Sequence, residues 1–336
     1  MKRDKKKIAR VVATWVVTAV MLSVFLLDTA VLVLDNRYVS AISVADEDFT
    51  LKNGDDRIHF LNTANSDCIL IESNGRFALV DSGEGNENPR KDEGYKGYRD
   101  EVLSYIKKVA ADEKGNVSLD FMLATHMHYD HAGNFAYIIS HKDISIRKAY
   151  IKEYDTSSVS AMDKENWGNG EMYDNIIKAL KDNNVPVVQD LPEDSFSFGD
   201  FTIQFINSKT PDEITVENEN ANSVGVKITK GDKIAFLAAD ITADTGLEDY
   251  YADTIGDVDL LKIGHHGYYG SSSKDFLKVL KPEICICTNQ IGKVYPNVKW
   301  NITMVAKAPL FSTAHRNGII ASFTDEDTIV LTQNIM

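Results

Sequence analysis

The sequence predicts an α+β protein in which two β-sheets pack face to face and helices cover both outer faces, an αββα sandwich. Three observations lead to this class. Short strand-like segments follow one another closely at the start of the body, and helical apolar spacing then appears between further strands. One continuous stretch of about 280 residues also shows no internal repeat and no second linker. Such an order of strands and helices is typical of sheets covered by helices, so we expect one domain over residues 56–336.

The first half of this body supplies strands separated by turns, together with two amphipathic helices. A helix over residues 98–110 places Val102, Leu103 and Ile106 on one face. A second helix over residues 172–181 carries apolar side chains at the same spacing. Strands are expected at 57–61, 68–72, 76–81, 119–124 and 147–151, and Asn, Ser and Gly turns separate the first three.

The second half of the body returns to strands joined by tight turns. The turn at Gly199-Asp200 divides the first pair, and the turn over residues 230–232 divides the next. One helix is expected at 274–280. The strands are expected at 196–198, 201–206, 224–229, 233–238, 260–263, 284–288, 319–323 and 328–331.

The amino terminus carries the pattern of a membrane anchor. Residues 1–10 hold six basic side chains, and an apolar segment over residues 11–34 follows, interrupted only by Asp28, which we place near a membrane interface. The basic flank is expected to stay cytoplasmic, which leaves the rest of the chain outside as a single-pass protein of the cell membrane. Secretion after cleavage of a signal peptide is the alternative. Residues 35–55 are polar and acidic and are interpreted as a linker.

Composition narrows the function classes. The 336 residues are 43% hydrophobic and contain 7 Pro, which excludes a disordered or collagen-like chain. From residue 11 onward 30 basic and 49 acidic residues remain, a net charge of −19, so the body lacks the basic footprint typical of nucleic-acid binding. Three cysteines without a CxxC spacing provide neither a disulfide framework nor a thiolate metal site.

The strongest chemical signal directly follows the strand at 119–124. His126, His128, Asp130 and His131 place four metal-ligating side chains within six residues. We expect His126 and His128 to face one ion, and Asp130 and His131 to face a second. Imidazole and carboxylate together suit Zn²⁺, Mn²⁺ or Fe ions.

Two later features complete a two-metal site. Asp240 ends the apolar strand at 233–238, where its carboxylate is placed to bridge two ions or, alternatively, to cap a following helix. His265 and His266 follow the strand at 260–263. One of them is expected to complete the second metal and the other to face the substrate; a pair of buried structural histidines is the alternative.

These motifs resemble the metallo-β-lactamase superfamily of binuclear hydrolases over residues 56–333. The resemblance implies that His126 and His128 bind the first metal, that Asp130, His131 and His265 bind the second, and that Asp240 is shared. It further implies that Asp81, in the motif Leu79-Val80-Asp81-Ser82-Gly83, orients the histidine-rich loop. Many members have another His between that loop and the bridging Asp. Here the interval contains only His141, which is too close to the first motif, so the first metal is expected to have three protein ligands.

A narrower resemblance concerns residues 60–67, Asn222-Ser223 and residues 261–267. These stretches are similar to the hydrolase domain of competence DNA-uptake channels and to the catalytic domain of the cell-wall phosphorylcholine esterase. The similarity to the esterase extends through segments without ligands. It implies an extracytoplasmic enzyme with two divalent cations, Zn²⁺ foremost, acting on phosphoesters of the cell envelope.

The catalytic roles are assigned on the same basis. Asp130 and Asp81 set the geometry of the site, and His266 donates a hydrogen bond to developing charge. A choline headgroup would need an aromatic cage, and the candidates are Tyr129, Trp167, Tyr173, Tyr268 and Tyr269. Two alternative functions stay open. One is a nuclease acting on DNA, and the other is a non-catalytic envelope-binding module that keeps the fold. We expect a monomer.

Overall fold

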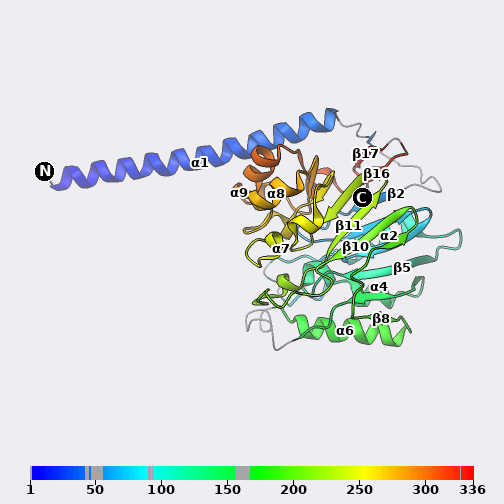
Figure 1. Cartoon of the computed structure of the whole chain (residues 1–336). Coiled ribbons are helices and arrows are strands. Elements are labelled where there is room, and N and C mark those ends of the chain that lie inside the picture. The colour runs from blue at the N-terminus through cyan, green and yellow to red at the C-terminus, as the bar shows by residue number, and fades with distance from the viewer. Residues whose placement is uncertain are drawn as a thin grey trace.

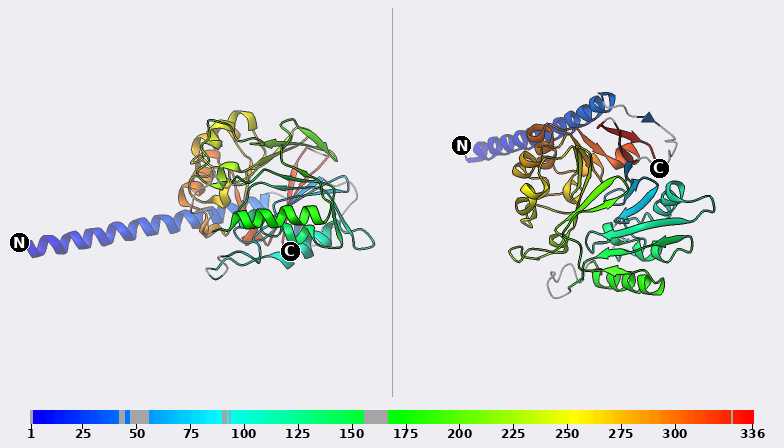
Figure 2. Two further views of the ribbon diagram at one scale, coloured as in Figure 1. Left: turned by 90° about the horizontal axis from the view of Figure 1, so that it is seen from below. Right: turned by 45° about the vertical axis from the view of Figure 1, so that its right-hand side comes forward.

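Two β-sheets lie face to face between two layers of helices, and one long helix extends from them (Figure 1). The computed structural model describes residues 2–41, 45–46, 56–89, 92, 94–155, 167–325 and 327–336. The order of layers, helix, sheet, sheet and helix, is clearest in the right-hand view of Figure 2. The predicted αββα sandwich is therefore confirmed.

The first sheet is mixed. Its strands follow the order β1-β17-β16-β2-β3-β4-β5-β7-β8, and β6 also pairs with β5. Their bounds are β1 (Ala45–Asp46), β2 (Asp56–Phe60), β3 (Ile69–Ser73), β4 (Arg76–Val80), β5 (Val117–Ala124), β6 (Ile144–Ile146), β7 (Ala149–Ile151), β8 (Val187–Val188), β16 (Ile319–Phe323) and β17 (Ile329–Gln333).

The second sheet has the order β15-β14-β13-β12-β11-β10-β9. Its bounds are β9 (Phe196–Phe198), β10 (Phe201–Ile206), β11 (Gly225–Lys230), β12 (Lys233–Leu237), β13 (Leu260–Lys262), β14 (Ile284–Cys287) and β15 (Leu310–Ser312). β15 is not expected from the sequence, because three residues are too few to show an alternating pattern.

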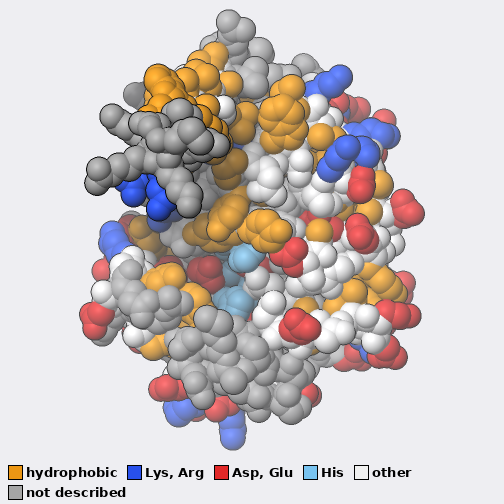
Figure 3. Space-filling view, turned by 90° about the vertical axis from the view of Figure 1, so that its left-hand side faces the viewer, with side chains coloured by type: hydrophobic (Ala, Val, Ile, Leu, Met, Phe, Trp, Pro, Cys, Tyr) orange, Lys and Arg blue, Asp and Glu red, His pale blue; other side chains and the backbone are white. Residues whose placement is uncertain are grey.

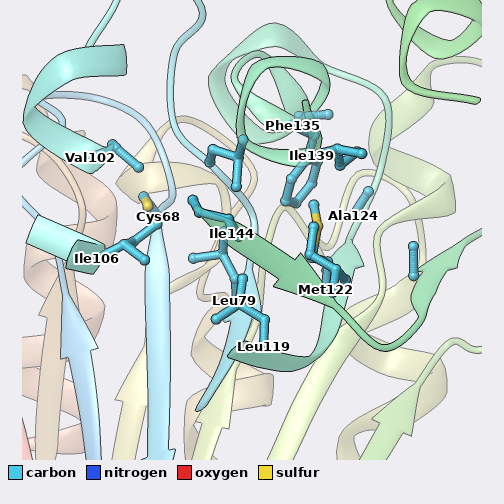
Figure 4. Close-up of a cluster of buried hydrophobic side chains, with 14 of the residues drawn as sticks. Cys68, Leu79, Val102, Ile106, Leu119, Met122, Ala124, Phe135, Ile139 and Ile144 are labelled. Atoms are coloured by element: carbon cyan, nitrogen blue, oxygen red, sulfur yellow. The ribbon is translucent and has the colours of Figure 1, made fainter. Parts of the chain in front are cut away.

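Three apolar clusters hold the layers together. The cluster between the sheets gathers alternate side chains of both, with Phe121 in edge-to-face contact with Phe198 and Phe205. A second cluster lies under α2 (Arg99–Ala110), α4 (Phe135–Ile139) and α6 (Asn169–Asp182), where Met122 and Phe135 meet (Figure 4). The third lies under α7 (Leu247–Ile255), α8 (Lys274–Leu280) and α9 (Pro296–Trp300). Because each amphipathic helix buries one face on a sheet, burial rather than intrinsic propensity fixes its place.

Short helical segments fill the connections between these elements. They are α3 (Tyr129–Ala132), α10 (Thr313–Arg316), η2 (Glu219–Asn222), η3 (Gly264–Gly267), η4 (Ile291–Lys293) and η5 (Asn301–Ala306).

Helix α1 (Lys2–Ala41) is longer than the expected span and includes the first residues of the expected linker. Of the remainder of that linker, Ala45–Asp46 forms β1 beside β17, and residues 42–44 and 47–55 lie outside the described residues. Within α1, Arg10–Val31 is long and apolar enough to cross a membrane. A signal sequence has the same length and composition, so the helix alone does not fix the topology.

Parallel pairing determines where the polar residues of interest lie. β4 and β5 run parallel in the first sheet, and β12, β13 and β14 run parallel in the second. The carboxyl ends of parallel strands share one edge of a sheet, which is where open α/β sheets place their ligands. The residues that directly follow these strands are Asp81, Thr125, Ala238, Ile263 and Thr288.

Candidate metal centre

The loop after β5 carries the histidine-rich motif into the interior. His126 and His131 are buried, and His128 is partly exposed. The Nε2 atom of His126 lies 3.1 Å from Nδ1 of His128. His126 Nδ1 lies 3.1 Å from the Thr125 hydroxyl and 3.2 Å from the Ser223 hydroxyl, which turns Nε2 toward His128. The first two histidines of the motif therefore converge, as the sequence predicts.

Asp81 holds this loop in place from the end of β4. Its carboxylate accepts hydrogen bonds from the Thr125 amide at 2.9 Å, from the Thr125 hydroxyl at 2.8 Å and from His131 Nδ1 at 2.7 Å. Because a carboxylate only accepts hydrogen bonds, His131 carries its proton on Nδ1 and presents the Nε2 lone pair to the site. The orienting position expected for Asp81 agrees with these contacts.

Asp240 enters the site from the second sheet, just beyond β12. One carboxylate oxygen, Oδ1, lies 3.2 Å from His131 Nε2 and 3.5 Å from His266 Nε2. The other, Oδ2, lies 3.7 Å from His126 Nε2 and 3.8 Å from His265 Nε2. The two oxygens of a single buried carboxylate thus face two separate groups of imidazoles.

The two adjacent histidines, His265 and His266, lie in a strained turn that follows β13. Both His265 and His266 have left-handed backbone conformations, with φ of 46° and 51°. The turn passes so close to the Ile241 carbonyl oxygen that a Cβ at Gly264 would collide with it. Such backbone strain at non-glycine residues is concentrated at functional sites. Here the strain directs two consecutive imidazoles toward the same carboxylate.

His266 is fully buried and faces the second half of the motif. Its Nε2 lies 3.1 Å from His131 Nε2 and 3.5 Å from Asp130 Oδ2. Its Nδ1 lies 3.0 Å from the Thr288 hydroxyl and 3.3 Å from Asp67 Oδ1. Since the Thr288 hydroxyl donates to Asp67, it accepts from His266 Nδ1, which leaves the His266 Nε2 lone pair facing that of His131.

This arrangement of donors fits divalent cations. Two groups of ligand atoms emerge, one from His126, His128 and Asp240, the other from Asp67, His131, Asp240 and His266. With zinc–nitrogen bonds of about 2.0–2.1 Å, two ligands at a tetrahedral angle stand about 3.3 Å apart. The observed nitrogen–nitrogen distances of 3.1 Å are close to that value. A cation between the nitrogens would relieve the repulsion between facing lone pairs.

The histidine-rich loop lies in a segment that matches a known family. Residues 61–219 match the family model of the metallo-beta-lactamase superfamily. These residues form a metallo-beta-lactamase domain. Asp240, His265 and His266 lie beyond the matched residues, and the fold brings them to the motif that lies within it.

Two curated relatives match part of this chain at low identity. "Recombination protein 2" of Haemophilus influenzae is 22% identical over 222 residues, which are 66% of this chain and 23% of that protein. "ComE operon protein 3" of Bacillus subtilis is 23% identical over 176 residues, which are 52% of this chain and 20% of that protein. The chain therefore spans less than a quarter of the length of these relatives. Among solved structures, the metallo-beta-lactamase fold protein YhfI from Bacillus subtilis is 14% identical, with a TM-score of 0.49 over 80% of this chain and 99% of that one.

The positions of the adjacent histidines differ from the sequence-based expectation. His265 was expected at the second metal and His266 toward the substrate. The geometry favours the reverse, because His266 is the one that meets His131 and Asp130, whereas the His265 side chain is 30% exposed and lies nearer the first group. In this metallo-beta-lactamase domain we therefore assign the second site to Asp130, His131, His266 and the shared Asp240.

Two side chains of η2 lie beside the first group. Glu219 accepts a hydrogen bond from the Met127 amide at 3.1 Å, and Asn220 Nδ2 lies 3.4 Å from His265 Nε2. His141 lies elsewhere, where its Nδ1 accepts a hydrogen bond from the Asp143 amide. Among the described residues, the first group thus consists of three side chains that could hold a cation, His126, His128 and Asp240.

Asp67 and Lys262 take part in the centre, and the sequence assigned neither a role. Buried Lys262, at the end of β13, forms an ion pair with Asp67 and donates to the Ala239 carbonyl at 3.0 Å. Although Asp67 is near enough to His131 to serve as a ligand, its oxygens already bind Lys262 and Thr288. It therefore orients His266 from behind. A lysine within a buried strand is the signal that would have pointed to this contact.

Buried carboxylates give the centre a field that favours positive charge. Burial alone would lower the pKa of His131, but Asp240 and Asp81 raise it well above its ordinary value. Burial likewise works to raise the pKa of Asp240, and the histidines around it, His131 foremost, hold that pKa well below its usual range. Cations bound at these positions would supply such charge.

Of the aromatic side chains considered for a choline cage, two lie beside the centre. The Trp167 ring is centred 5.9 Å from that of His128, and the Tyr268 ring is centred 5.4 Å from that of His265. Tyr173 instead contacts Tyr154 and accepts a hydrogen bond from Gln189. The described contacts therefore do not bring the candidates together as one cage.

Proposed function

We propose that the protein is a membrane-anchored, extracytoplasmic hydrolase of phosphoesters in the cell envelope, with a two-metal site. The superfamily match supports the coarser statement, a metal-dependent hydrolase. One observation carries the proposal: Asp240 directs its two oxygens to two separate groups of histidines. A shared carboxylate between two nitrogen-rich groups is what a pair of divalent cations needs.

The residues of the chain have distinct tasks in this proposal. His126, His128 and Asp240 would hold one cation, and Asp130, His131, His266 and Asp240 the other. Cations at these places supply Lewis-acid activation of water and neutralise charge on the phosphoryl oxygens. Asp81 fixes the orientation of His131, and Asp67 with Thr288 fixes that of His266.

His265 is the residue we assign to the substrate. It is the more exposed of the two adjacent histidines and remains near Asp240. Its imidazole is placed to donate a hydrogen bond to charge that develops on a bound phosphoester. This is the role that the sequence suggested for His266.

Cleavage of nucleic acid is the second candidate, and the similarity to "Recombination protein 2" and "ComE operon protein 3" favours it. The charge of the body argues against it, because a net charge of −19 repels a polyanion. Turnover of single-stranded DNA, measured beside release of phosphocholine from cell-wall polymer, separates the two candidates.

The direct test of the proposal is hydrolysis of bis-p-nitrophenyl phosphate by the purified full-length protein. We expect turnover in the wild type and a loss of at least about 100-fold in Asp240→Asn and His128→Ala, because each removes a group that holds the charge-stabilising cations. His141→Ala serves as the matched control, since His141 lies outside the centre. Activity unchanged in both site variants, or a metal-free inactive wild type, would contradict the proposal; the second result would favour a non-catalytic binding module.

A further inference from the structure

The second half of α1 packs against the layer of helices on the second sheet. It contacts α9, β15 and η4. Asp28 forms an ion pair with Lys299 of α9, whose side chain is buried. Val31, almost one turn further along α1, is buried in the apolar cluster that covers the second sheet. These contacts fix the point at which α1 leaves the domain.

The part of α1 before Asp28 projects away from the domain (Figures 1 and 2). Residues 11–27 carry no charge, and nearly all their side chains are exposed. Seventeen residues at a rise of about 1.5 Å extend about 25 Å, slightly less than the ~30 Å hydrocarbon core of a bilayer. A span this short leaves no extra helix between the membrane and the domain. The domain surface around Asp28 would therefore lie at the membrane boundary.

Apolar side chains are exposed on the α9 side of that surface. Outside α1, the large apolar side chains exposed among the described residues are Val187, Tyr250, Tyr269, Tyr295, Trp300 and Met304. We call the last four the apolar rim. The rings of Tyr269 and Tyr295 are centred 6.0 Å apart, and Trp300 and Met304 stand four residues apart on the helical run that Tyr295 precedes. Tyr and Trp are the side chains enriched at membrane–water interfaces.

The apolar rim adjoins the metal centre. Tyr268 has its ring centred 6.3 Å from that of Tyr295 and 5.4 Å from that of His265. Figure 3 views the molecule from the side toward which α1 projects, and histidine side chains appear there in a hollow with hydrophobic side chains beside it. His265 and His128 are the partly exposed histidines of the centre. The opening of the site and the projecting helix thus share one face.

We propose that the apolar rim rests on the bilayer that α1 spans, so that the site opens toward the lipid headgroup layer. The proposal rests on the membrane anchoring included in the proposed function. It identifies the partner of this face as a lipid bilayer surface. It also narrows the substrate class to phosphoesters carried in, or directly above, the headgroups.

A nitroxide label on the rim tests this orientation. The three native cysteines are buried, so Met304→Cys in the full-length protein offers one reactive thiol. In phosphatidylcholine–phosphatidylglycerol vesicles we compare the accessibility of each label to oxygen with its accessibility to a water-soluble nickel complex. We expect this ratio to be several-fold higher for a label at 304 than for a label at 114. Lys114→Cys is the control, because residue 114 precedes the amino end of β5 and the site lies beyond its carboxyl end. Equal water accessibility at 304 and 114 in vesicles would overturn the proposal.

A second measurement separates this inference from the proposed function. Turnover of bis-p-nitrophenyl phosphate by the same labelled protein reports hydrolysis without any need for a membrane surface. Normal turnover with a water-exposed label at 304 would overturn the orientation alone. A label in the interface with no turnover would support the orientation and contradict the hydrolase.

Discussion

Asp81 orients a histidine of the metal centre without itself being one of the groups that would hold a cation. Its side chain accepts hydrogen bonds from Thr125 and His131, so it couples the end of β4 to the histidine-rich loop. Burial raises the pKa of Asp81, and His131 counteracts that effect. The His131 proton and the two hydrogen bonds from Thr125 therefore offset part of the cost of burying this carboxylate.

Replacing Asp81 should consequently weaken metal binding. In Asp81→Asn the amide oxygen is a weaker acceptor for His131 Nδ1 than the carboxylate, so we expect metal affinity to fall about 10- to 100-fold. Competition with a chromophoric chelator measures the change. Asp120→Asn is the control, because Asp120 pairs with Arg76 away from the centre. Equal affinity in Asp81→Asn and the wild type would show that this carboxylate does not orient the ligand.

The two adjacent histidines can be told apart by metal content. His266→Ala removes a nitrogen that faces His131 at 3.1 Å, so we expect one bound metal to be lost. His265→Ala leaves the ligands that we assign to both sites in place. We expect it to keep both metals while turnover falls. Elemental analysis by mass spectrometry measures the metal content of each variant. Loss of one metal in His265→Ala, with both kept in His266→Ala, would restore the sequence-based assignment.

At the level of elements, the loop after His266 is tied to the start of α7. Glu248 lies on that helix, and its carboxylate accepts hydrogen bonds from the amides of Ser272 and Ser273 at 2.5 and 2.8 Å. Burial raises the pKa of Glu248 from 4.5 to about 7. The ionised carboxylate therefore costs folding free energy at this position.

This cost should appear as a pH dependence of stability. Below pH 4.5 Glu248 is protonated in both the folded and unfolded chain; as pH rises toward 7 the unfolded chain ionises first, and stability falls. The shift corresponds to a loss on the order of 3 kcal/mol, complete above pH 7. We expect the wild type to lose stability relative to Glu248→Gln between pH 5 and 8, as measured by urea unfolding. A constant difference between the two proteins across that range would contradict the shift.

The parts of the site that the sequence predicts are those whose residues lie close together in the chain. His126, His128, Asp130 and His131 are adjacent in sequence, so their spacing alone predicts the loop. The exchange of His265 and His266 depends on two left-handed backbone conformations that neither residue type indicates. The ion pair of Asp67 with Lys262 joins residues far apart in the chain, one in the loop between β2 and β3 of the first sheet and the other on β13 of the second. Such contacts exist only once both sheets have formed.

At the scale of the whole molecule, the centre lies between two sheets that are otherwise joined by apolar packing. The first sheet supplies the histidine-rich loop, and the second supplies Asp240 and His266. Cations held by both would bridge the two halves of the sandwich. Such cations would bind the folded chain more tightly than the unfolded one, because only folding brings their ligands together, so they would add to the stability of the fold.

Chelation should therefore destabilise the protein. A metal present at 100 times its Kd contributes about 2.7 kcal/mol, so we expect EDTA to lower the Tm of the wild type by several degrees. Differential scanning calorimetry measures the shift. Asp240→Asn, which lacks the shared ligand, should respond much less. If EDTA shifted both proteins equally, the chelator would be acting outside this centre.

The central claim is that one chain builds two cation sites around a shared carboxylate. Anomalous scattering from a crystal of residues 46–336 tests it most directly, with data collected on both sides of the zinc, iron and manganese absorption edges. The account predicts two peaks, one beside His126 and His128 and one beside Asp130, His131 and His266, with Asp240 between them. A single peak away from Asp240, or no peak in protein that still hydrolyses phosphodiesters, would contradict it.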